Sequence, residues 1–123
     1  MAKVLIIDDD QSMQSLYQRI FTLEGFEVEV ASGGIEGLEK ALSFSPDIIL
    51  LDMMMPVVNG LEVLSKLKAD DRLKDIPVIV MSNYSEMGIT AHAMELGATQ
   101  YFVKSDIEPV NLVAVVRTTL APK

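Results

Sequence analysis

Residues 47–60 read DIILLDMMMPVVNG, and this stretch decides the fold. Residues 48–51 form a short run of aliphatic side chains, with Pro46 before it and Pro56 after it. The run is too brief for a helix, and it is typical of a strand that is buried on both faces of a parallel sheet. It ends on a carboxylate, Asp52, where the chain enters a loop. We therefore expect a buried strand with an acidic side chain at its carboxyl end.

Composition narrows the class of protein. The chain has 123 residues, half of them hydrophobic, which suits a single domain with one core. It contains no apolar stretch near the roughly 18 residues of a membrane helix, and its first residues do not form a secretory signal. A net charge of −8 argues against binding to the phosphate backbone of nucleic acids. The absence of cysteine excludes disulfides and thiolate metal sites, and it fits the cytoplasmic location that we expect.

A strand followed by a helix recurs five times along the chain. The predicted strands cover residues 3–7, 26–30, 48–51, 77–81 and 99–103, and the predicted helices cover residues 11–24, 34–44, 61–68, 86–96 and 108–120. Strands that alternate with helices over short links indicate an α/β fold, in which helices cover both faces of a parallel sheet. In the first helix, apolar side chains recur at helical spacing, at Met13, Leu16, Tyr17, Ile20 and Phe21.

Polar side chains stand at the carboxyl ends of four of the five predicted strands. They are Asp8 and Asp9 after the first strand, Asp52 after the third, Ser82 after the fourth and Lys104 after the fifth. Strand 26–30 alternates apolar and acidic residues and ends on Ala-Ser-Gly-Gly, so we place it at an edge of the sheet. A strand order of 2-1-3-4-5 explains this distribution. Ligands of such sheets bind outside the carboxyl ends, near the point where the strand order reverses.

This set of side chains is suited to phosphoryl chemistry. Three carboxylates at one edge repel one another, and a hard divalent cation relieves that repulsion. Mg²⁺, with Mn²⁺ as a substitute, prefers a few carboxylates, a carbonyl and several waters. Lys104 and the hydroxyl of Ser82 are equipped to neutralise phosphoryl oxygens. Asp52 lies between the acidic pair and the lysine, which makes it the candidate nucleophile for an acyl phosphate.

Together these motifs resemble the receiver domain of two-component response regulators (CheY-like). The residues that carry the resemblance are Asp8-Asp9, Asp52 with Met55-Pro56 and Gly60, Ser82, and Gly97-Ala98 leading to Tyr101 and Lys104. Each motif is weak alone, but five in order at five element ends are specific. The resemblance spans nearly the whole chain and implies a single receiver domain over residues 1–123. The implied fold is a flavodoxin-like (βα)5 three-layer sandwich.

The resemblance also implies a role for each residue of the site. Asp52 resembles the phosphoacceptor, which takes a phosphoryl group from the phosphohistidine of a sensor histidine kinase or of a phosphotransfer protein. Asp8 and Asp9 resemble the metal-binding pair, which would hold Mg²⁺ together with Asp52 and the backbone carbonyl of Met54. Lys104 resembles the lysine that pairs with the phosphoryl oxygens.

Two further positions resemble the switch residues of the family. Ser82 resembles the hydroxyl that moves onto the phosphoryl group, and Tyr101 the aromatic that turns inward with it. Phosphorylation would then control the surface formed by residues 86–96, 99–103 and 108–120, where a downstream protein target binds. A homodimer on phosphorylation is a further expectation. The protein would be a signalling switch and not an enzyme, apart from self-catalysed phosphotransfer and slow autodephosphorylation.

The sequence departs from the family at several positions. Ser105 stands where the family has a proline after the lysine, so we expect either a trans bond with an altered loop or a strained cis bond. Asn83 replaces a small residue and narrows access to the site. Met54 and Tyr84 resemble positions that screen the attacking water, and their bulk predicts slow loss of the phosphoryl group.

Several of these residues also have plainer interpretations. Asp10 precedes the first helix, and an N-cap explains it better than a ligand role. The methionines of residues 53–55 fit loop packing better than a soft-metal site, which would need His or Cys beside them. His92, the only histidine, lies between alanines and is expected to be solvated. Helix 108–120 is apolar around much of its girth, which core packing explains unless part of it binds a partner.

Three other functions compete with the switch. A phosphohydrolase with an aspartyl nucleophile commonly carries a second acid two residues after it, but this position is Met54. A nucleotide or flavin carrier needs a phosphate-binding loop after the first strand, and three consecutive aspartates are the electrostatic opposite. A receiver-like interaction scaffold that is never phosphorylated stays open because of Ser105 and Asn83.

Overall fold

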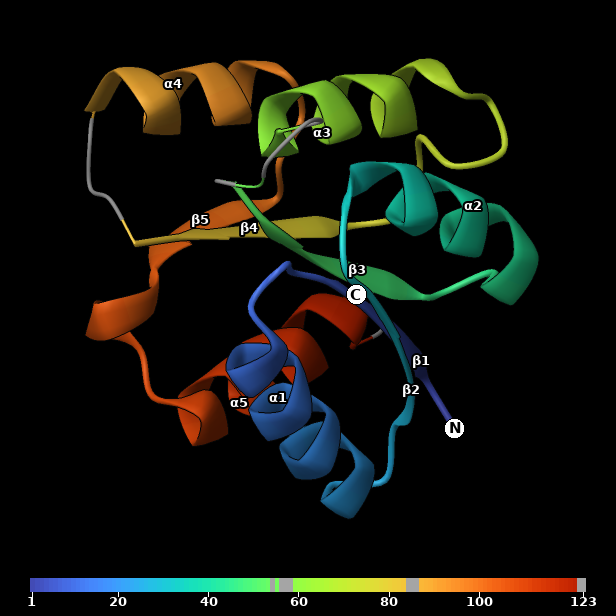
Figure 1. Cartoon of the computed structure of the whole chain (residues 1–123), viewed down its shortest axis with the longest axis vertical. Coiled ribbons are helices and arrows are strands. Elements are labelled where there is room, and N and C mark those ends of the chain that lie inside the picture. Colours follow the sequence, from blue (N-terminus) through green and yellow to red (C-terminus); the bar gives the residue numbers. More distant parts are fainter. Residues whose placement is uncertain (54, 56–58, 84–86, 122–123) are drawn as a thin grey trace.

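The computed structural model describes residues 1–53, 55, 59–83 and 87–121. These residues form one sheet flanked by helices (Figure 1). The strands are β1 (Lys3–Ile7), β2 (Glu27–Ala31), β3 (Ile48–Asp52), β4 (Val78–Ser82) and β5 (Gln100–Val103). The helices are α1 (Gln11–Leu23), α2 (Gly34–Phe44), α3 (Gly60–Ala69), α4 (Met87–Glu95) and α5 (Pro109–Leu120), with a 3-10 turn at Lys104–Asp106. The alternation of strand and helix predicted from the sequence is confirmed, and no element end is shifted by more than one residue.

All neighbouring strands are parallel, and their order is β2-β1-β3-β4-β5, as predicted. The register aligns the carboxyl ends of the central strands. Ile7 of β1 lies beside Leu51 of β3, so Asp8 and Asp52 come next on adjacent strands at the same level. Ser82 of β4 lies beside Val103 of β5, directly before Lys104. The residues that end or follow these four strands, from Asp8 to Lys104, therefore lie at one edge of the sheet.

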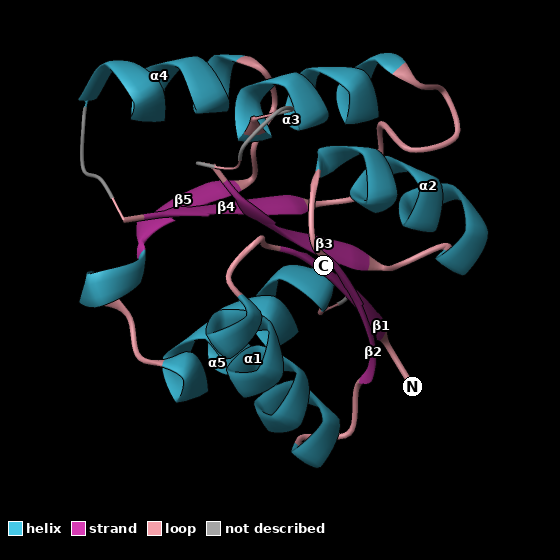
Figure 2. Ribbon diagram, viewed as in Figure 1, coloured by secondary structure: helices cyan, strands magenta, loops and turns pink. Residues whose placement is uncertain are grey.

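Helices cover both faces of the sheet and complete three layers (Figure 2). α1 and α5 lie on one face, where Phe21 and Val116 pack with Ile6 and Leu50 of the strands. α2, α3 and α4 lie on the other face, where residues such as Leu64 pack with the alternate residues of the same strands. Every residue of β3 is buried, which confirms the interpretation of residues 48–51. No helix in the described residues is long and apolar enough to cross a membrane.

β2 is the outer strand on its side of the sheet, and its exposure alternates along its length. Glu27 and Glu29 are exposed, whereas Val28 and Val30 are half-buried. The predicted edge position with one partly solvated face is confirmed.

The inward face of α1 differs from the pattern that the apolar residues suggested. The buried residues of this helix are Gln14, Tyr17 and Phe21, whereas Leu16 is 41% exposed. The spacing of 14, 17 and 21 is itself helical, so a polar side chain shares the sheet-facing stripe with two aromatic ones. The helix therefore presents an amide to the sheet one turn after its start.

Gly60, the first residue of α3, allows close approach between this helix and the end of β3. A Cβ atom at this position would lie 2.6 Å from both the Asp52 carbonyl oxygen and the Met53 Cα atom. The Gly60 N–H donates to the Met53 carbonyl at 2.9 Å, and the side chain of Asn59 caps the helix by accepting from the Glu62 N–H at 3.0 Å. The absence of a side chain at residue 60 thus fixes the position of α3 against the residue that ends β3.

Candidate functional site

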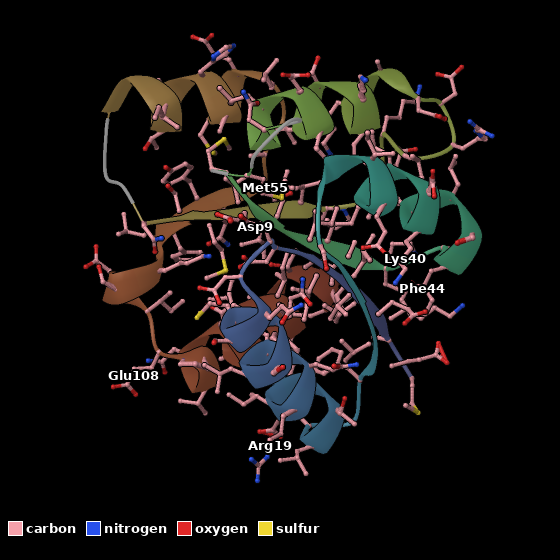
Figure 3. All side chains as sticks on the ribbon, in the orientation of Figure 1. Asp9, Arg19, Lys40, Phe44, Met55 and Glu108 are labelled. Carbon is pink, nitrogen blue, oxygen red and sulfur yellow. The ribbon has the colours of Figure 1, made fainter. Side chains whose placement is uncertain are left out.

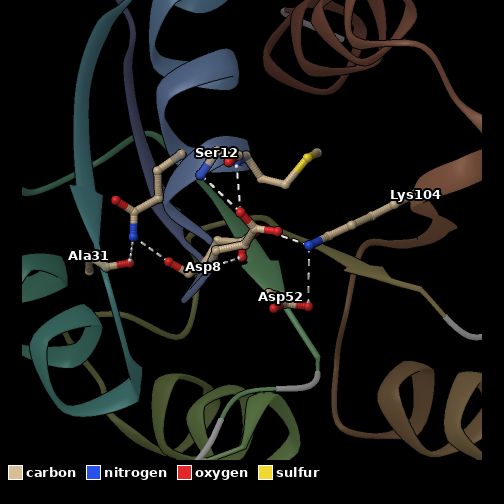
Figure 4. Close-up of polar contacts among 8 residues, drawn as sticks. Asp8, Ser12, Ala31, Asp52 and Lys104 are labelled. Atoms are coloured by element: carbon tan, nitrogen blue, oxygen red, sulfur yellow. Dashed lines mark hydrogen bonds and ion pairs between the residues drawn. The ribbon is translucent and has the colours of Figure 1, made fainter.

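The polar residues at the carboxyl ends of β1, β3 and β5 meet at one point (Figure 4). Asp8 and Asp9 follow β1, Asp52 is the last residue of β3, and Lys104 follows β5. Figure 3 shows Asp9 on the loop after β1, near the centre of the view, while charged residues such as Arg19 and Glu108 point outward at its margin. The gathering of these side chains that the sequence predicted is confirmed.

Three carboxylates form the core of the site. Asp8, Asp9 and Asp52 each offer a carboxylate oxygen, and these oxygens all lie within 4.8 Å of one another. Asp8 is only 3% exposed and Asp52 only 6%, whereas Asp9 is exposed. Like charges at such distances repel strongly where burial lowers the local dielectric.

Lys104 offsets part of this charge. Its Nζ lies 2.8 Å from Asp8 Oδ2 and 3.6 Å from Asp52 Oδ1, and its side chain is only 8% exposed. One ammonium among three ionised carboxylates leaves a formal charge of −2 on these four groups. The sequence placed the lysine with the phosphoryl oxygens, and the structure adds an ion pair with Asp8 that the sequence did not reveal.

The second oxygen of Asp8 is held by the backbone. Asp8 Oδ1 accepts a hydrogen bond from the Asp10 N–H at 2.9 Å. The side chain of Asp10 turns away to cap α1, accepting from the N–H groups of Ser12 at 2.9 Å and Met13 at 3.3 Å. The N-cap interpretation of Asp10 is therefore confirmed. Of the three consecutive acids, Asp10 caps the helix, and Asp8 and Asp9 belong to the acidic cluster.

The cluster fits a hard divalent cation. Its donors are carboxylate oxygens from three side chains, the ligand type that Mg²⁺ and Mn²⁺ prefer. The residual negative charge also favours a cation. Of the soft donors considered from the sequence, Met53 and Met55 are buried in the hydrophobic core and His92 is exposed. The packing interpretation of these two methionines is confirmed over a soft-metal site.

The comparison with known families decides where the chain belongs. Residues 4–117 match the model of the response regulator receiver domain. The chain belongs to this family.

The fold of this receiver domain is close to that of solved receiver structures. Chemotaxis protein CheY4 of Vibrio cholerae has a TM-score of 0.89 at 30% identity, with 96% of this chain and 98% of that one covered. A CheY-like receiver domain from Methanospirillum hungatei has a TM-score of 0.91 at 27% identity, with 98% and 94% covered.

Curated relatives of this receiver domain differ in length. Sporulation initiation phosphotransferase F of Bacillus subtilis is 35% identical over 109 residues, covering 88% of this chain and 86% of that protein. The transcriptional regulator RpaA of Synechocystis is also 35% identical, and the receiver domain spans about half of its length (49%). A protein-glutamate methylesterase of Rhodospirillum rubrum is 42% identical, but the match covers 29% of that enzyme. The receiver domain thus makes up most of some relatives and a smaller part of others.

The remaining predicted site residues of the receiver domain occupy distinct surroundings. Ser82 is fully buried at the end of β4, and Tyr101 is half-buried on β5, packed against the core on the α2–α3–α4 face. No described peptide bond is cis, so the trans alternative holds for Lys104–Ser105, where the chain makes a 3-10 turn. Met54 and Tyr84 lie outside the described residues, and the roles expected of them stay predictions.

Gln14 is a residue near the receiver site that sequence reasoning missed. Its Nε2 donates to the main-chain carbonyl of Asp8 and to Ser32 Oγ at 3.0 Å, with the Ala31 carbonyl at 3.5 Å. The side chain is 8% exposed. The spacing of 14, 17 and 21 could have identified it, because it places a polar residue on the sheet-facing stripe one turn beyond the helix cap.

Tyr17 is a second missed residue, and it lies beneath the acids. It is 3% exposed and lines the same small internal space as Asp8 and Asp52. Burial raises the pKa of its hydroxyl from 10 to about 12, and the negative charges of Asp8 and then Asp52 add to the effect. A neutral phenol is therefore favoured over a phenolate below the acidic cluster.

This raised pKa predicts a loss of stability in alkali. The folded protein holds the Tyr17 proton up to a pH of about 12, whereas the unfolded chain releases it near 10. The contribution is constant below pH 10, and about 2 to 3 kcal/mol of unfolding free energy is lost as the pH rises to about 12. Ultraviolet absorbance titration in a chelator should show a tyrosine transition near pH 12 that the control variant Tyr17→Phe lacks. Urea unfolding at increasing pH should show a weaker pH dependence for Tyr17→Phe, and equal slopes would contradict the prediction.

Proposed function

We propose that the chain is a phosphorylation-controlled signalling switch, formed by one receiver domain over residues 1–123. Asp52 takes a phosphoryl group from the phosphohistidine of a sensor histidine kinase or a phosphotransfer protein, in a reaction that depends on Mg²⁺ or Mn²⁺. The observation that carries the proposal is the convergence of three carboxylates within 4.8 Å with an ammonium 2.8 Å from Asp8 and 3.6 Å from Asp52. Membership of the receiver family supports the same reading.

Asp52 is the nucleophile because the other two acids are engaged differently. Both carboxylate oxygens of Asp8 are held, one by Lys104 and one by the Asp10 N–H. Asp9 is exposed, whereas Asp52 closes the central strand β3 and is buried beside Lys104. A carboxylate fixed at a strand end presents its oxygen in one direction, which favours attack on a bound phosphoryl group.

Each side chain of the site has a place in the transfer. A carboxylate oxygen of Asp52 forms a bond to phosphorus, the bond from phosphorus to the donor imidazole breaks, and that imidazole nitrogen takes up a proton. Lys104, already between Asp8 and Asp52, stabilises the charge on the phosphoryl oxygens. The Ser82 hydroxyl donates to one of those oxygens. Mg²⁺, when bound by Asp8, Asp9 and Asp52 with the Met54 carbonyl, offsets the charge of the acids and of the incoming anion.

Phosphorylated Asp52 changes the surface of the protein, and it is hydrolysed slowly. Ser82 and Tyr101 lie on β4 and β5, from which a change at Asp52 reaches the surface formed by α4, β5 and α5. We propose that this surface binds a downstream protein, with homodimerisation on phosphorylation, in the cytoplasm. Methionine at position 54 offers no general acid to the leaving group, so hydrolysis is slow and the chain acts as a switch, not as an enzyme.

The experiment that tests the proposal is intact-mass analysis after incubation with acetyl phosphate, a small-molecule phosphoryl donor. With Mg²⁺ or Mn²⁺ we expect one added phosphoryl group, and with a chelator none. Reduction of the labelled protein with borohydride, followed by peptide mapping, should place the modification at residue 52. Labelling at another residue, or equal labelling in the chelator, would contradict the proposal. Repeated turnover of a phosphomonoester would favour a phosphohydrolase, and no label under any condition would favour an unphosphorylated scaffold.

A further inference from the structure

Gln14 reaches the acidic cluster through the backbone of Asp8. Its amide nitrogen, on the buried face of α1, donates to the Asp8 main-chain carbonyl and also contacts the loop after β2 at Ser32 Oγ, 3.0 Å away. We propose that Gln14 is a positioning residue of the metal site. By holding the Asp8 carbonyl it orients the peptide that joins Asp8 to Asp9, and so sets the metal affinity of the pair. This inference rests on the proposed function.

The amide of Gln14 donates to a backbone carbonyl just beyond the last hydrogen-bonded pair of β1 and β2. The Asp8 N–H still donates to the Ala31 carbonyl at 3.0 Å, one step beyond the last paired residues of β1 and β2. A continuing parallel ladder would supply the next donor to the Asp8 carbonyl from the β2 side. The chain turns instead, because Gly33 is the N-cap of α2 and the Ser32 N–H donates to Glu36 Oε1 at 2.6 Å. Gln14 supplies a donor to that carbonyl from α1.

The orientation of this one peptide bears on both acids. In a planar trans peptide the carbonyl of one residue and the N–H of the next point in opposite directions. Fixing the Asp8 carbonyl on the Gln14 side therefore fixes the plane from which the Asp9 side chain departs. The Asp8 carboxylate is anchored on the other side, with Oδ1 on the Asp10 N–H and Oδ2 on Lys104. Asp8 is thus held at both its carbonyl and its carboxylate, so the peptide to Asp9 leaves from a fixed residue.

An amide suits this role because it donates hydrogen bonds without carrying charge. A lysine or arginine here would hold the carbonyl equally well but would compete with a cation for the acids. Outer partners that orient metal ligands commonly change metal affinity by 10- to 100-fold when they are replaced. We therefore expect Gln14→Met, which keeps the length of the side chain and removes its donors, to weaken Mg²⁺ binding by at least about tenfold.

The test measures the Mg²⁺ dissociation constant by calorimetry for the parent and three variants. Ser32→Ala removes the hydroxyl acceptor of the Gln14 amide and keeps the bond to Asp8, so its affinity for Mg²⁺ should stay within about twofold of the parent. Val116→Ala removes buried methyl groups from α5 and serves as the reference for lost stability away from the acids. The rate of labelling by acetyl phosphate is followed against Mg²⁺ concentration. Gln14→Met should need a higher Mg²⁺ concentration for half-maximal labelling but approach the parent rate at saturating Mg²⁺. A general loss of stability does not separate these two quantities.

Weaker binding in Gln14→Met alone supports the inference. An unchanged dissociation constant in Gln14→Met, or an equal loss in Val116→Ala, overturns it while the proposed function stands. A parent that binds no Mg²⁺ overturns the proposed function first. Should Gln14→Met fail to fold, Gln14→Asn replaces it, because its amide is one methylene short of the Asp8 carbonyl and the same weakening is expected.

Discussion

Asp52→Asn is expected to take up no phosphoryl group from acetyl phosphate, even at saturating Mg²⁺. The substitution preserves the shape of the side chain but replaces a carboxylate with an amide, whose oxygen is a poor nucleophile. The fold should persist, because Lys104 keeps its 2.8 Å ion pair with Asp8 and the repulsion among the three acids falls. Intact-mass analysis of the parent and the variant, treated in parallel, measures the loss.

The matched control is Asp10→Asn. Asp10 is also an acid of the loop after β1, but its side chain caps α1 and does not join the cluster. Asparagine is an equally good N-cap, so this variant should keep the stability of the parent and take up the phosphoryl group. Loss of labelling in both variants would show that acidic charge in the loop, and not the nucleophile at residue 52, controls the reaction. Labelling of Asp52→Asn at the parent level would refute the assignment.

Gly60→Ala is expected to destabilise the protein strongly, although it adds a single methyl group. The new Cβ would meet the Asp52 carbonyl oxygen and the Met53 Cα atom at 2.6 Å, and these are backbone atoms of the strand end that cannot rotate away. The start of α3 must move, which strains the 2.9 Å hydrogen bond from the Gly60 N–H to the Met53 carbonyl. Overpacking of this kind costs about 3 kcal/mol of unfolding free energy. Because the clash lies at Asp52 itself, Mg²⁺ binding should weaken as well.

Urea unfolding checks this prediction, with Gly88→Ala as the control. Gly88 lies in α4, and a Cβ atom there meets no other atom within 4 Å. Alanine is the better helix former, so this variant should gain about 0.5 to 1 kcal/mol. Gly60 does not have a left-handed backbone, so its expected loss comes from contact alone. A Gly60→Ala protein as stable as the parent would show that α3 can slide along the end of β3 without cost.

The sequence predicted the layout of the sheet because its signals are local and additive. An aliphatic run between Pro46 and Pro56 defines a buried strand, and acidic alternation in residues 26–30 defines an edge. The strand order then followed from which strands have a charged or hydroxyl side chain at their carboxyl ends. Carboxyl ends of parallel strands meet at one edge, so Asp8, Asp52 and Lys104 could be brought together without knowledge of any side-chain contact.

Side-chain partners and the docking of α1 could not be predicted in this way. Which residues of a helix face the sheet depends on its rotation about its own axis, and an apolar count favoured Leu16 where packing selected Gln14. The ion pair between Lys104 and Asp8 joins residues 96 apart in the sequence, and its formation depends on where the 3-10 turn after β5 begins. Both features are set by tertiary contacts that override local pattern.

The exposed acids of β2 have a consequence for how copies of this protein meet. An outer strand offers unpaired backbone groups to any strand that approaches it, and pairing of such edges between copies leads to aggregation. Here Glu27 and Glu29 alternate along that strand and remain in solvent, so a second copy aligned with it would bring rows of like charge together. β2, which contributes no acid to the cluster, is thereby protected against edge-to-edge pairing with another copy.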